Sequence, residues 1–161
     1  MEEAEEITLV IMAISRVLVG MSARALAGAD ESLTLTQLRT LVVLEDCGPL
    51  KLVGLARVLG VNPSTAMRMV DRLEGAGLVE RRVNPENRRE VTVRLREDGE
   101  ALVREVMGRR RAEVEALVAR LTDEERAGLV PGLRALAGAA EEMGLVGRPV
   151  TGDAGDRLPF G

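Results

Sequence analysis

Two pairs of arginines are the residues of this chain whose type and spacing best suit a binding chemistry. Arg68 and Arg72 are four positions apart, so a helix through them would place both on one face. Arg88 and Arg89 are adjacent, in a polar stretch rich in turn residues. Guanidinium groups bind phosphate oxygens and the O6 and N7 atoms of guanine. These residues therefore point first to the recognition of a nucleic acid.

Basic residues are concentrated in the middle of an acidic chain. The 161 residues include 22 Lys and Arg and 26 Asp and Glu, for a net charge of −4. Residues 51–96 hold ten basic and five acidic residues, a net charge of +5, which leaves −9 for the rest of the chain. A basic centre flanked by acidic segments is typical of a nucleic-acid-binding module. A solvated surface of mixed charge is the alternative that this distribution leaves open.

The composition excludes several kinds of active site. The chain has no His and one Cys, so it lacks a conventional zinc site, an internal disulfide and the machinery of Ser–His and Cys–His hydrolases. With no Trp or Tyr and one Phe, it has no aromatic platform for single-stranded nucleic acid. The acidic trio at 123–125 lies at a predicted helix start, where carboxylates interact favourably with the helix dipole. We predict no metal, no cofactor and no enzymatic activity.

The first arginine pair lies on a helix with strong boundary signals. Asn62 is a good N-cap, Pro63 suits the first helical position, and the helix is predicted to run to about Gly75. Its inner face consists of Ala66, Val70 and Leu73. Two helices are predicted before it, over Leu33–Asp46 and Val53–Leu59, with a short extended piece between them.

The second arginine pair lies in a predicted hairpin. The hydrophobic period changes to two after residue 77, which predicts strands over 78–83 and 91–95 with a polar turn between them. Helix, short strand, helix, turn, helix and hairpin is the order of a winged helix-turn-helix. In that motif the last helix enters the major groove of DNA. We therefore predict a mainly α fold with a two-stranded β-hairpin wing.

This order assigns DNA contacts to two sets of residues. The N-terminal part of the recognition helix meets base edges, and arginine in a narrow hairpin tip suits the minor groove. The predicted contacts of the recognition helix are Asn62, Ser64, Thr65, Arg68, Met69 and Arg72, and those of the wing are Arg88 and Arg89. Solvated surface residues are the alternative for both arginine pairs. For the helix pair, that alternative includes neutralisation by Asp71 and Glu74.

Long apolar helices are predicted on both sides of this module. Residues 7–27 are apolar around most of a helix, which indicates burial on several sides, and an oligomer interface would provide it. Further helices are predicted over 97–121 and 122–143, and the Gly- and Pro-rich residues 144–161 are predicted to be a flexible tail. Arg16 interrupts the apolar run at 7–20, which is too short to span a bilayer, and the acidic start does not fit a signal peptide. We expect a cytoplasmic protein with no membrane partner.

The combined pattern resembles the multiple-antibiotic-resistance regulator (MarR) family. The matching segments are LTQLRTLVVLEDCGPL, LARVLGVNPSTAMRMVDRLEGAGLVERR and NPENRREVTVRLREDG. With the flanking helices, the resemblance covers roughly residues 7–143. It implies a homodimer in which residues 7–32 and 97–143 form a dimerisation domain and residues 33–96 form the DNA-binding domain. The interface residues that it implies are Val10, Ile14, Leu18, Leu117, Leu121, Leu129, Leu133 and Leu136.

The resemblance also implies a function. Members of the family typically repress transcription from a pseudo-palindromic operator in double-stranded DNA, and a small aromatic acid or phenol typically relieves the repression. The candidate ligand pocket is Met12, Arg16 and Met21; packing methionines and an intersubunit ion pair of Arg16 are the alternatives. The family usually has Asp before the wing arginines, where this chain has Asn87, so the rigidity of the wing is open.

Two other functions fit parts of the sequence. A winged helix can be a protein–protein interaction module without DNA binding, although the basic helix face and wing argue against it. Cys47, the single thiol, would be the sensor of a redox-responsive regulator. Such sensors in this family generally carry the thiol on the first helix near tyrosines, whereas Cys47 follows the second helix and the chain has no Tyr. We expect Cys47 to be buried at a helix end.

Overall fold

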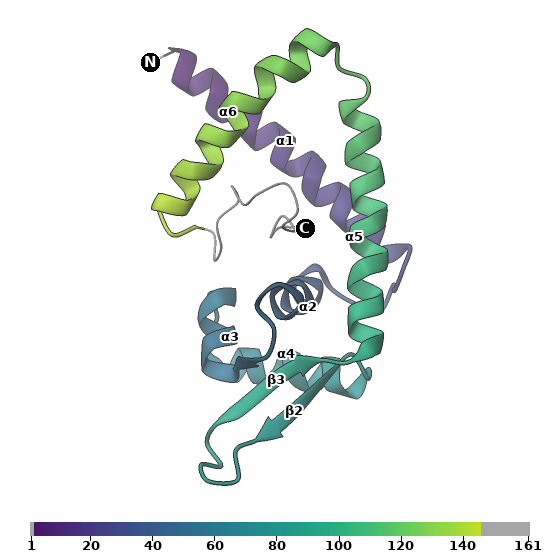
Figure 1. Ribbon diagram of the computed structural model, residues 1–161, viewed down its shortest axis with the longest axis vertical. Helices are drawn as coiled ribbons and strands as arrows, with labels where there is room; N and C mark the ends of the chain where they lie inside the picture. Colours follow the sequence, from purple (N-terminus) through teal and green to yellow (C-terminus); the bar gives the residue numbers. More distant parts are fainter. Residues whose placement is uncertain (1, 146–161) are drawn as a thin grey trace.

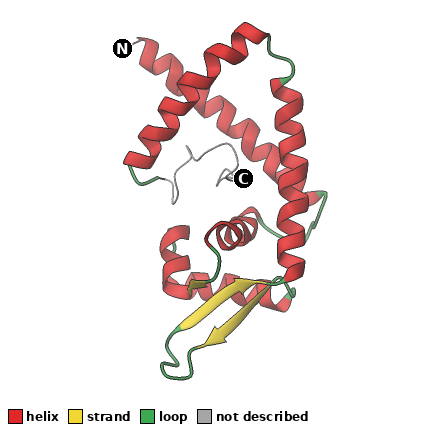
Figure 2. Ribbon diagram, in the orientation of Figure 1, coloured by secondary structure: helices red, strands yellow, loops and turns green. Residues whose placement is uncertain are grey.

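The computed structural model describes residues 2–145, which form six helices and a three-stranded antiparallel sheet (Figures 1 and 2). In chain order the elements are α1 (Glu2–Ala27), α2 (Leu35–Cys47), β1 (Leu50–Lys51), α3 (Leu52–Leu59), α4 (Pro63–Gly75), β2 (Val79–Val83), β3 (Val91–Leu95), α5 (Glu97–Val118) and α6 (Asp123–Glu142). The predicted mainly α winged helix-turn-helix is confirmed. The wing hairpin gains a third strand, because β1 pairs with β3 in the order β1-β3-β2.

Local sequence signals determine where α2 and α4 begin. The Thr34 hydroxyl accepts a hydrogen bond from the backbone N–H of Gln37, and the Gln37 side chain accepts one from the backbone N–H of Thr34. This reciprocal capping box starts α2. At α4, Asn62 Oδ1 accepts the backbone N–H of Thr65 at 2.8 Å and Pro63 takes the first helical position, as predicted.

Several details differ from the sequence predictions, among them the start of α2, which lies at Leu35 after its Thr34 cap rather than at Leu33. Helix α1 begins at Glu2 rather than at residue 7, and the acidic residues of its first turn lie at the positive end of the helix dipole. Helix α5 ends at Val118, three residues early, because the chain turns before the cap of α6. The expectation of a buried Cys47 is wrong. The core-facing positions of α2 end at Leu44, so Cys47, the last residue of the helix, is exposed.

The hydrophobic core lies in the winged-helix half. Its fully buried side chains come from α2, α3, α4, the wing strands and α5; the largest are Leu41, Leu55, Leu73, Val70, Val79, Val93 and Val106. A Cβ at Gly99 would overlap the Leu78 carbonyl oxygen, so glycine allows α5 to start this close to the wing. Ala66, Val70 and Leu73, the inner face predicted for α4, are fully buried, so this prediction is confirmed. Their packing in the core holds α4 in place.

The other end of the molecule has little core of its own. Helix α5 runs along the long axis from the wing to the end where α1 and α6 lie (Figure 1). No residue of α6 is buried, and α1 is buried only from Met21 onward. Among residues 2–145, α1 is also the one helix long and apolar enough to cross a membrane by length and composition, which is weak evidence because core helices of soluble proteins pass the same test. Of the predicted tail, only residues 144 and 145 lie within the described part of the chain.

Candidate nucleic-acid interface

One outer face of α4 brings together four of the predicted recognition residues. Thr65, Arg68, Met69 and Arg72 follow one another at helical spacings of three, one and three, so they lie on the same face. They line an open depression of about 230 Å³. The two arginines are exposed, whereas Thr65 and Met69 are half-buried. This face opposes the buried Ala66, Val70 and Leu73, so the core orients it outward.

Asn62 and Ser64 form the start of this helix rather than its outer face. Asn62 Oδ1 accepts the Ser64 hydroxyl at 2.7 Å as well as the backbone N–H of Thr65. Both residues are exposed. Because the Asn62 oxygen is already used as a cap, its contribution within the chain is to position the first turn of α4.

The carboxylates of α4 do not neutralise the arginines of α4. Instead, Arg81 of β2 binds both of them, with Nη1 at 2.6 Å from Asp71 and Nη2 at 2.6 Å from Glu74. The backbone N–H of Arg81 also donates to Glu74 at 3.1 Å. Arg68 donates to the Thr65 hydroxyl at 3.2 Å. Within residues 2–145, neither Arg68 nor Arg72 has an ion pair, so the neutralisation by Asp71 and Glu74 that the sequence left open does not occur in this chain.

Arg81 is the residue of this region that sequence reasoning did not assign to the site. It lies ten residues after Asp71 and on a different element, so no local spacing rule connects the two. The alternation of apolar and polar residues in β2 indicated only that Arg81 would be on a strand. The structure shows that it joins the wing to the recognition helix.

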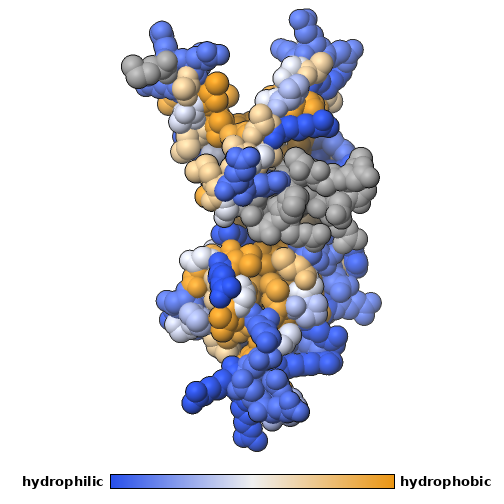
Figure 3. All heavy atoms as spheres, turned by 60° about the vertical axis from the view of Figure 1, so that its left-hand side comes forward, coloured by the Kyte–Doolittle hydropathy of each residue, from blue (hydrophilic) through white to orange (hydrophobic). Residues whose placement is uncertain are grey.

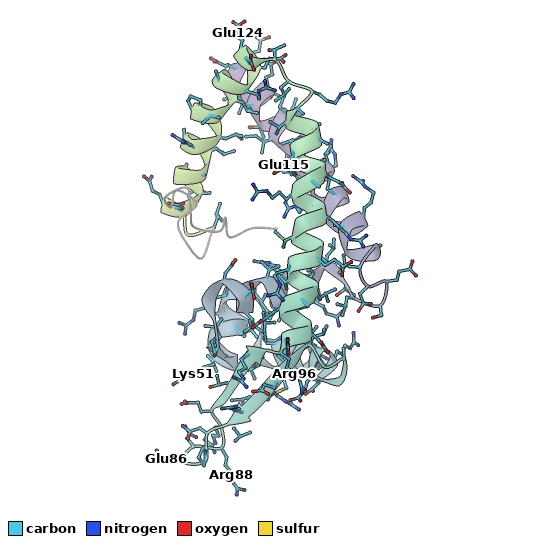
Figure 4. The ribbon with its side chains drawn as sticks, turned by 45° about the vertical axis from the view of Figure 1, so that its right-hand side comes forward. Lys51, Glu86, Arg88, Arg96, Glu115 and Glu124 are labelled. Carbon is cyan, nitrogen blue, oxygen red and sulfur yellow. The ribbon has the colours of Figure 1, made fainter. Side chains whose placement is uncertain are left out.

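The tip of the wing is shaped by asparagines and carries Arg88 and Arg89 outward. Asn84 donates its backbone N–H to the Glu90 carbonyl at 2.9 Å, which closes the hairpin. Asn87 Oδ1 accepts the backbone N–H of Arg89 at 3.2 Å. Asn87 therefore orders the turn with a neutral hydrogen bond. Figure 4 shows Arg88 pointing away from the tip, and neither tip arginine has an ion pair within the described chain.

The arginines along the wing strands are partly neutralised. Glu80 of β2 is bound by Arg94 of β3 and lies 3.4 Å from Arg82. The hydrogen bond from Arg94 holds the pKa of the Glu80 carboxyl below its ordinary value. Lys51 of β1 pairs with Glu90 at 3.1 Å. Within the described residues, Arg68 and Arg72 of α4 and Arg88 and Arg89 of the wing tip have no carboxylate partner. Helix α4 and the wing tip lie at the same end of the molecule (Figures 1 and 4).

The residues assigned to the dimer interface lie on surfaces that the chain does not cover. Six of the eight are exposed, among them Val10 at 60% and Leu133 at 53%, and Leu18 and Leu121 are half-buried. Figure 3 shows apolar side chains, in orange, between the two prongs at the top of the molecule. A single chain therefore presents a large apolar surface at this end.

The residues of the candidate ligand pocket do not share one environment in the single chain. Met21 is 7% exposed and belongs to the packed end of α1, whereas Met12 is 54% exposed and Arg16 is also exposed. Residues 2–145 contain no group of three or more His, Cys, Asp or Glu side chains that could hold a metal ion. The pocket therefore stays a prediction that concerns an assembly of chains.

Comparison with known proteins supports the same picture. The model of the MarR family matches residues 33–91. The transcriptional repressor NicR of Pseudomonas putida is 32% identical over 115 residues, which cover 71% of this chain and 73% of NicR. The repressor MdtR of Bacillus subtilis is 34% identical over 95 residues, or 59% of this chain and 61% of MdtR.

Solved structures resemble the whole architecture. The crystal structure of Rv1404 from Mycobacterium tuberculosis superposes with a TM-score of 0.77 at 44% identity, covering 84% of this chain and 92% of that one. A mutant of MarR from E. coli, complexed with operator DNA, gives a TM-score of 0.62 at 27% identity, covering 83% of this chain and 95% of that one. The fold is therefore shared with a protein, MarR from E. coli, whose mutant has been solved in complex with operator DNA.

Proposed function

The chain belongs to the MarR family of DNA-binding transcriptional regulators, which are not enzymes, and from this premise we propose that it is a homodimeric repressor of a pseudo-palindromic operator. The observation that carries the proposal is the set of arginines on α4 and the wing tip that lack a carboxylate partner. Arg81 neutralises the carboxylates beside them, so their charge is available to DNA. The names of NicR and MdtR as repressors support the direction of regulation.

In this proposal each half of the chain has its own task. Residues 33–96 bind DNA, with Thr65, Arg68, Met69 and Arg72 in the major groove and Arg88 and Arg89 in the minor groove. Residues 7–32 and 97–143 form the dimer. The exposed apolar faces of α1 and α6 support this, because burying them in a partner stabilises each chain. A regulator must reach the DNA, which favours a cytoplasmic location.

Release by a small aromatic acid is the second part of the proposal. The structure of BpsR from Bordetella bronchiseptica, at a TM-score of 0.56 and 26% identity, concerns regulation of that protein's DNA binding by 6-hydroxynicotinic acid. In this chain, Met12 and Arg16 are exposed on α1 and would face a cavity only once a second chain covers them. Arg16 then supplies a cation for a carboxylate.

A binding titration tests the proposal. Full-length protein is titrated into duplexes recovered from a random library by repeated selection, and binding is followed by fluorescence anisotropy with and without salicylate or 6-hydroxynicotinate. We expect tight binding to a two-fold-related sequence and release by at least one acid. Selection that enriches no sequence would reject a sequence-specific regulator, and unchanged binding with every acid would reject this effector class alone.

A further inference from the structure

The apolar part of the α4 depression, its floor, is the side chain of Met69, and a contact with α2 holds that side chain in place. Met69 lies between Arg68 and Arg72 along the helix face and lines the depression with them. Its sulfur is 4.0 Å from the hydroxyl of Thr40, a residue of α2 with no solvent exposure. The thioether is therefore held against the neighbouring helix, and the part of Met69 left accessible presents an apolar surface outward.

Two cationic groups flank this floor. The guanidinium of Arg68 is positioned by a hydrogen bond, because its Nη2 donates to the Thr65 hydroxyl at 3.2 Å. Arg72 lies one turn further along and has no ion pair within residues 2–145. The depression thus combines a small apolar surface with guanidinium donors on both sides. Its volume of about 230 Å³ exceeds that of a methyl group, and it is open toward solvent.

In the major groove, one base presents a group that suits such a surface. Thymine carries a 5-methyl group, and a neighbouring guanine presents the O6 and N7 acceptors that arginine binds. Cytosine instead presents an amino donor, which cannot pair with guanidinium donors. We propose that the Met69 depression receives the methyl group of a thymine that adjoins a guanine bound by Arg68. This makes Met69 and Thr65 determinants of specificity, and it rests on the proposed operator binding.

Replacing single functional groups of the DNA bases tests the proposed thymine contact directly. In a duplex selected by the full-length protein, each thymine of one half-site is replaced singly by deoxyuridine, which removes only the methyl group. We expect one thymine, next to a guanine, at which the replacement weakens binding about fourfold, the equivalent of burying one methyl group. Replacing the adjoining guanine by 7-deazaguanine removes the N7 acceptor and is expected to weaken binding at least as much.

Protein variants identify the surface responsible. In Met69→Ala the ratio of affinities for the thymine and uracil duplexes is expected to fall to about one, whereas Met69→Leu, which keeps an apolar side chain of similar size, should retain the preference. In Thr65→Val the loss of the hydroxyl is expected to reduce the guanine-to-7-deazaguanine ratio. Each ratio is measured within one protein preparation, so a partly unfolded variant does not distort it.

The possible outcomes distinguish a failure of the thymine contact from a failure of the proposed operator binding. If no duplex is enriched, sequence-specific binding itself fails. If a duplex is enriched but no thymine beside a guanine responds to uracil, the thymine assignment is overturned while operator binding stands. A uracil effect that persists unchanged in Met69→Ala would also overturn it, because another residue would then hold the methyl group.

Discussion

The arginines of the winged-helix half differ in whether a carboxylate neutralises them. Arg81 and Arg94 are engaged by acidic residues, which neutralise much of the charge that a phosphate would otherwise meet. Arg68, Arg72, Arg88 and Arg89 have no ion pair within residues 2–145, so DNA phosphates can bind them without that cost. The sequence alone placed all of these arginines in one basic region and could not separate the two groups.

Substitution of Arg68 by Ala tests whether an arginine without a carboxylate partner binds DNA. If Arg68 reads a guanine, the change is expected to cost about 1–3 kcal/mol of binding free energy and to relax base preference at one position in each half-site. Anisotropy titrations over a panel of single-base operator variants measure both effects. Arg120→Ala is the matched control, because Arg120 is an exposed arginine beyond the end of α5, far from the wing. An equal loss on all sequences would reduce Arg68 to a phosphate contact.

Some residue properties followed from local chemistry and others did not. Asn62 was correctly predicted as an N-cap, because that role depends only on the residues beside it. The expected burial of Cys47 failed, because the residue lies past the last core-facing position of α2. Exposure at a helix end depends on where the next element packs, and no spacing rule supplies that.

At the scale of elements, the side chain of Arg81 adds ion pairs between the wing and α4 to the packing of their buried residues. Arg81 of β2 binds both carboxylates of α4, and its guanidinium also lies 3.4 Å from the Met67 sulfur. The contact orients the strand relative to the helix and neutralises two anionic groups beside the proposed DNA-binding face of α4. Sequence periodicity predicted both elements to within one residue, but a contact between elements ten positions apart requires their packing to be known.

Arg81→Ala is expected to weaken operator binding more than it weakens the fold. The ion pairs are partly exposed, so their loss should lower the free energy of unfolding by only about 1 kcal/mol. Two uncompensated carboxylates would then repel the DNA backbone. Binding titrations and thermal unfolding separate the two effects. Adding Asp71→Asn and Glu74→Gln to Arg81→Ala should restore much of the affinity; no recovery would show that strand orientation, not charge, is the cause.

The wing should lose stability in acid because of Glu80. Its pKa is lowered in the folded protein by the hydrogen bond from Arg94, so the stabilisation is present above the ordinary glutamate pKa of about 4.3 and is lost as the pH falls through the lower folded-state value. Melting temperatures at fixed protein concentration, compared between the native protein and Glu80→Gln from pH 7 to pH 3, measure this. The difference is expected to shrink as the pH falls; a constant difference would contradict the assignment.

At the scale of the whole molecule, the core is concentrated in the winged-helix half and includes the end of α1 and the start of α5. The apolar pattern of residues 7–27 indicated that the first helix needs a partner. In the structure, α1 is buried only from Met21 onward and no residue of α6 is buried. A lone sequence can indicate that such surfaces exist. It cannot specify how a second chain would pack there, which in the proposed dimer would set the distance between the two recognition helices.

Leu133→Lys tests whether the α6 surface forms the dimer. Leu133 is 53% exposed in the single chain, so a lysine should be tolerated there unless a partner covers it. We expect sedimentation to show monomers and operator affinity to fall sharply, because one recognition helix then binds one half-site. Leu133→Met, which is apolar and similar in volume, should remain dimeric. A dimeric lysine variant would place the interface elsewhere.

The most direct test of DNA recognition by paired winged helices is a hydroxyl-radical footprint of the full-length protein on its selected duplex. We expect protection of two half-sites whose centres are about one helical turn, roughly 10 base pairs, apart. Flanking minor-groove protection should disappear in Arg89→Ala. A single protected patch, or no protection even at low salt where phosphate contacts are strongest, would contradict it.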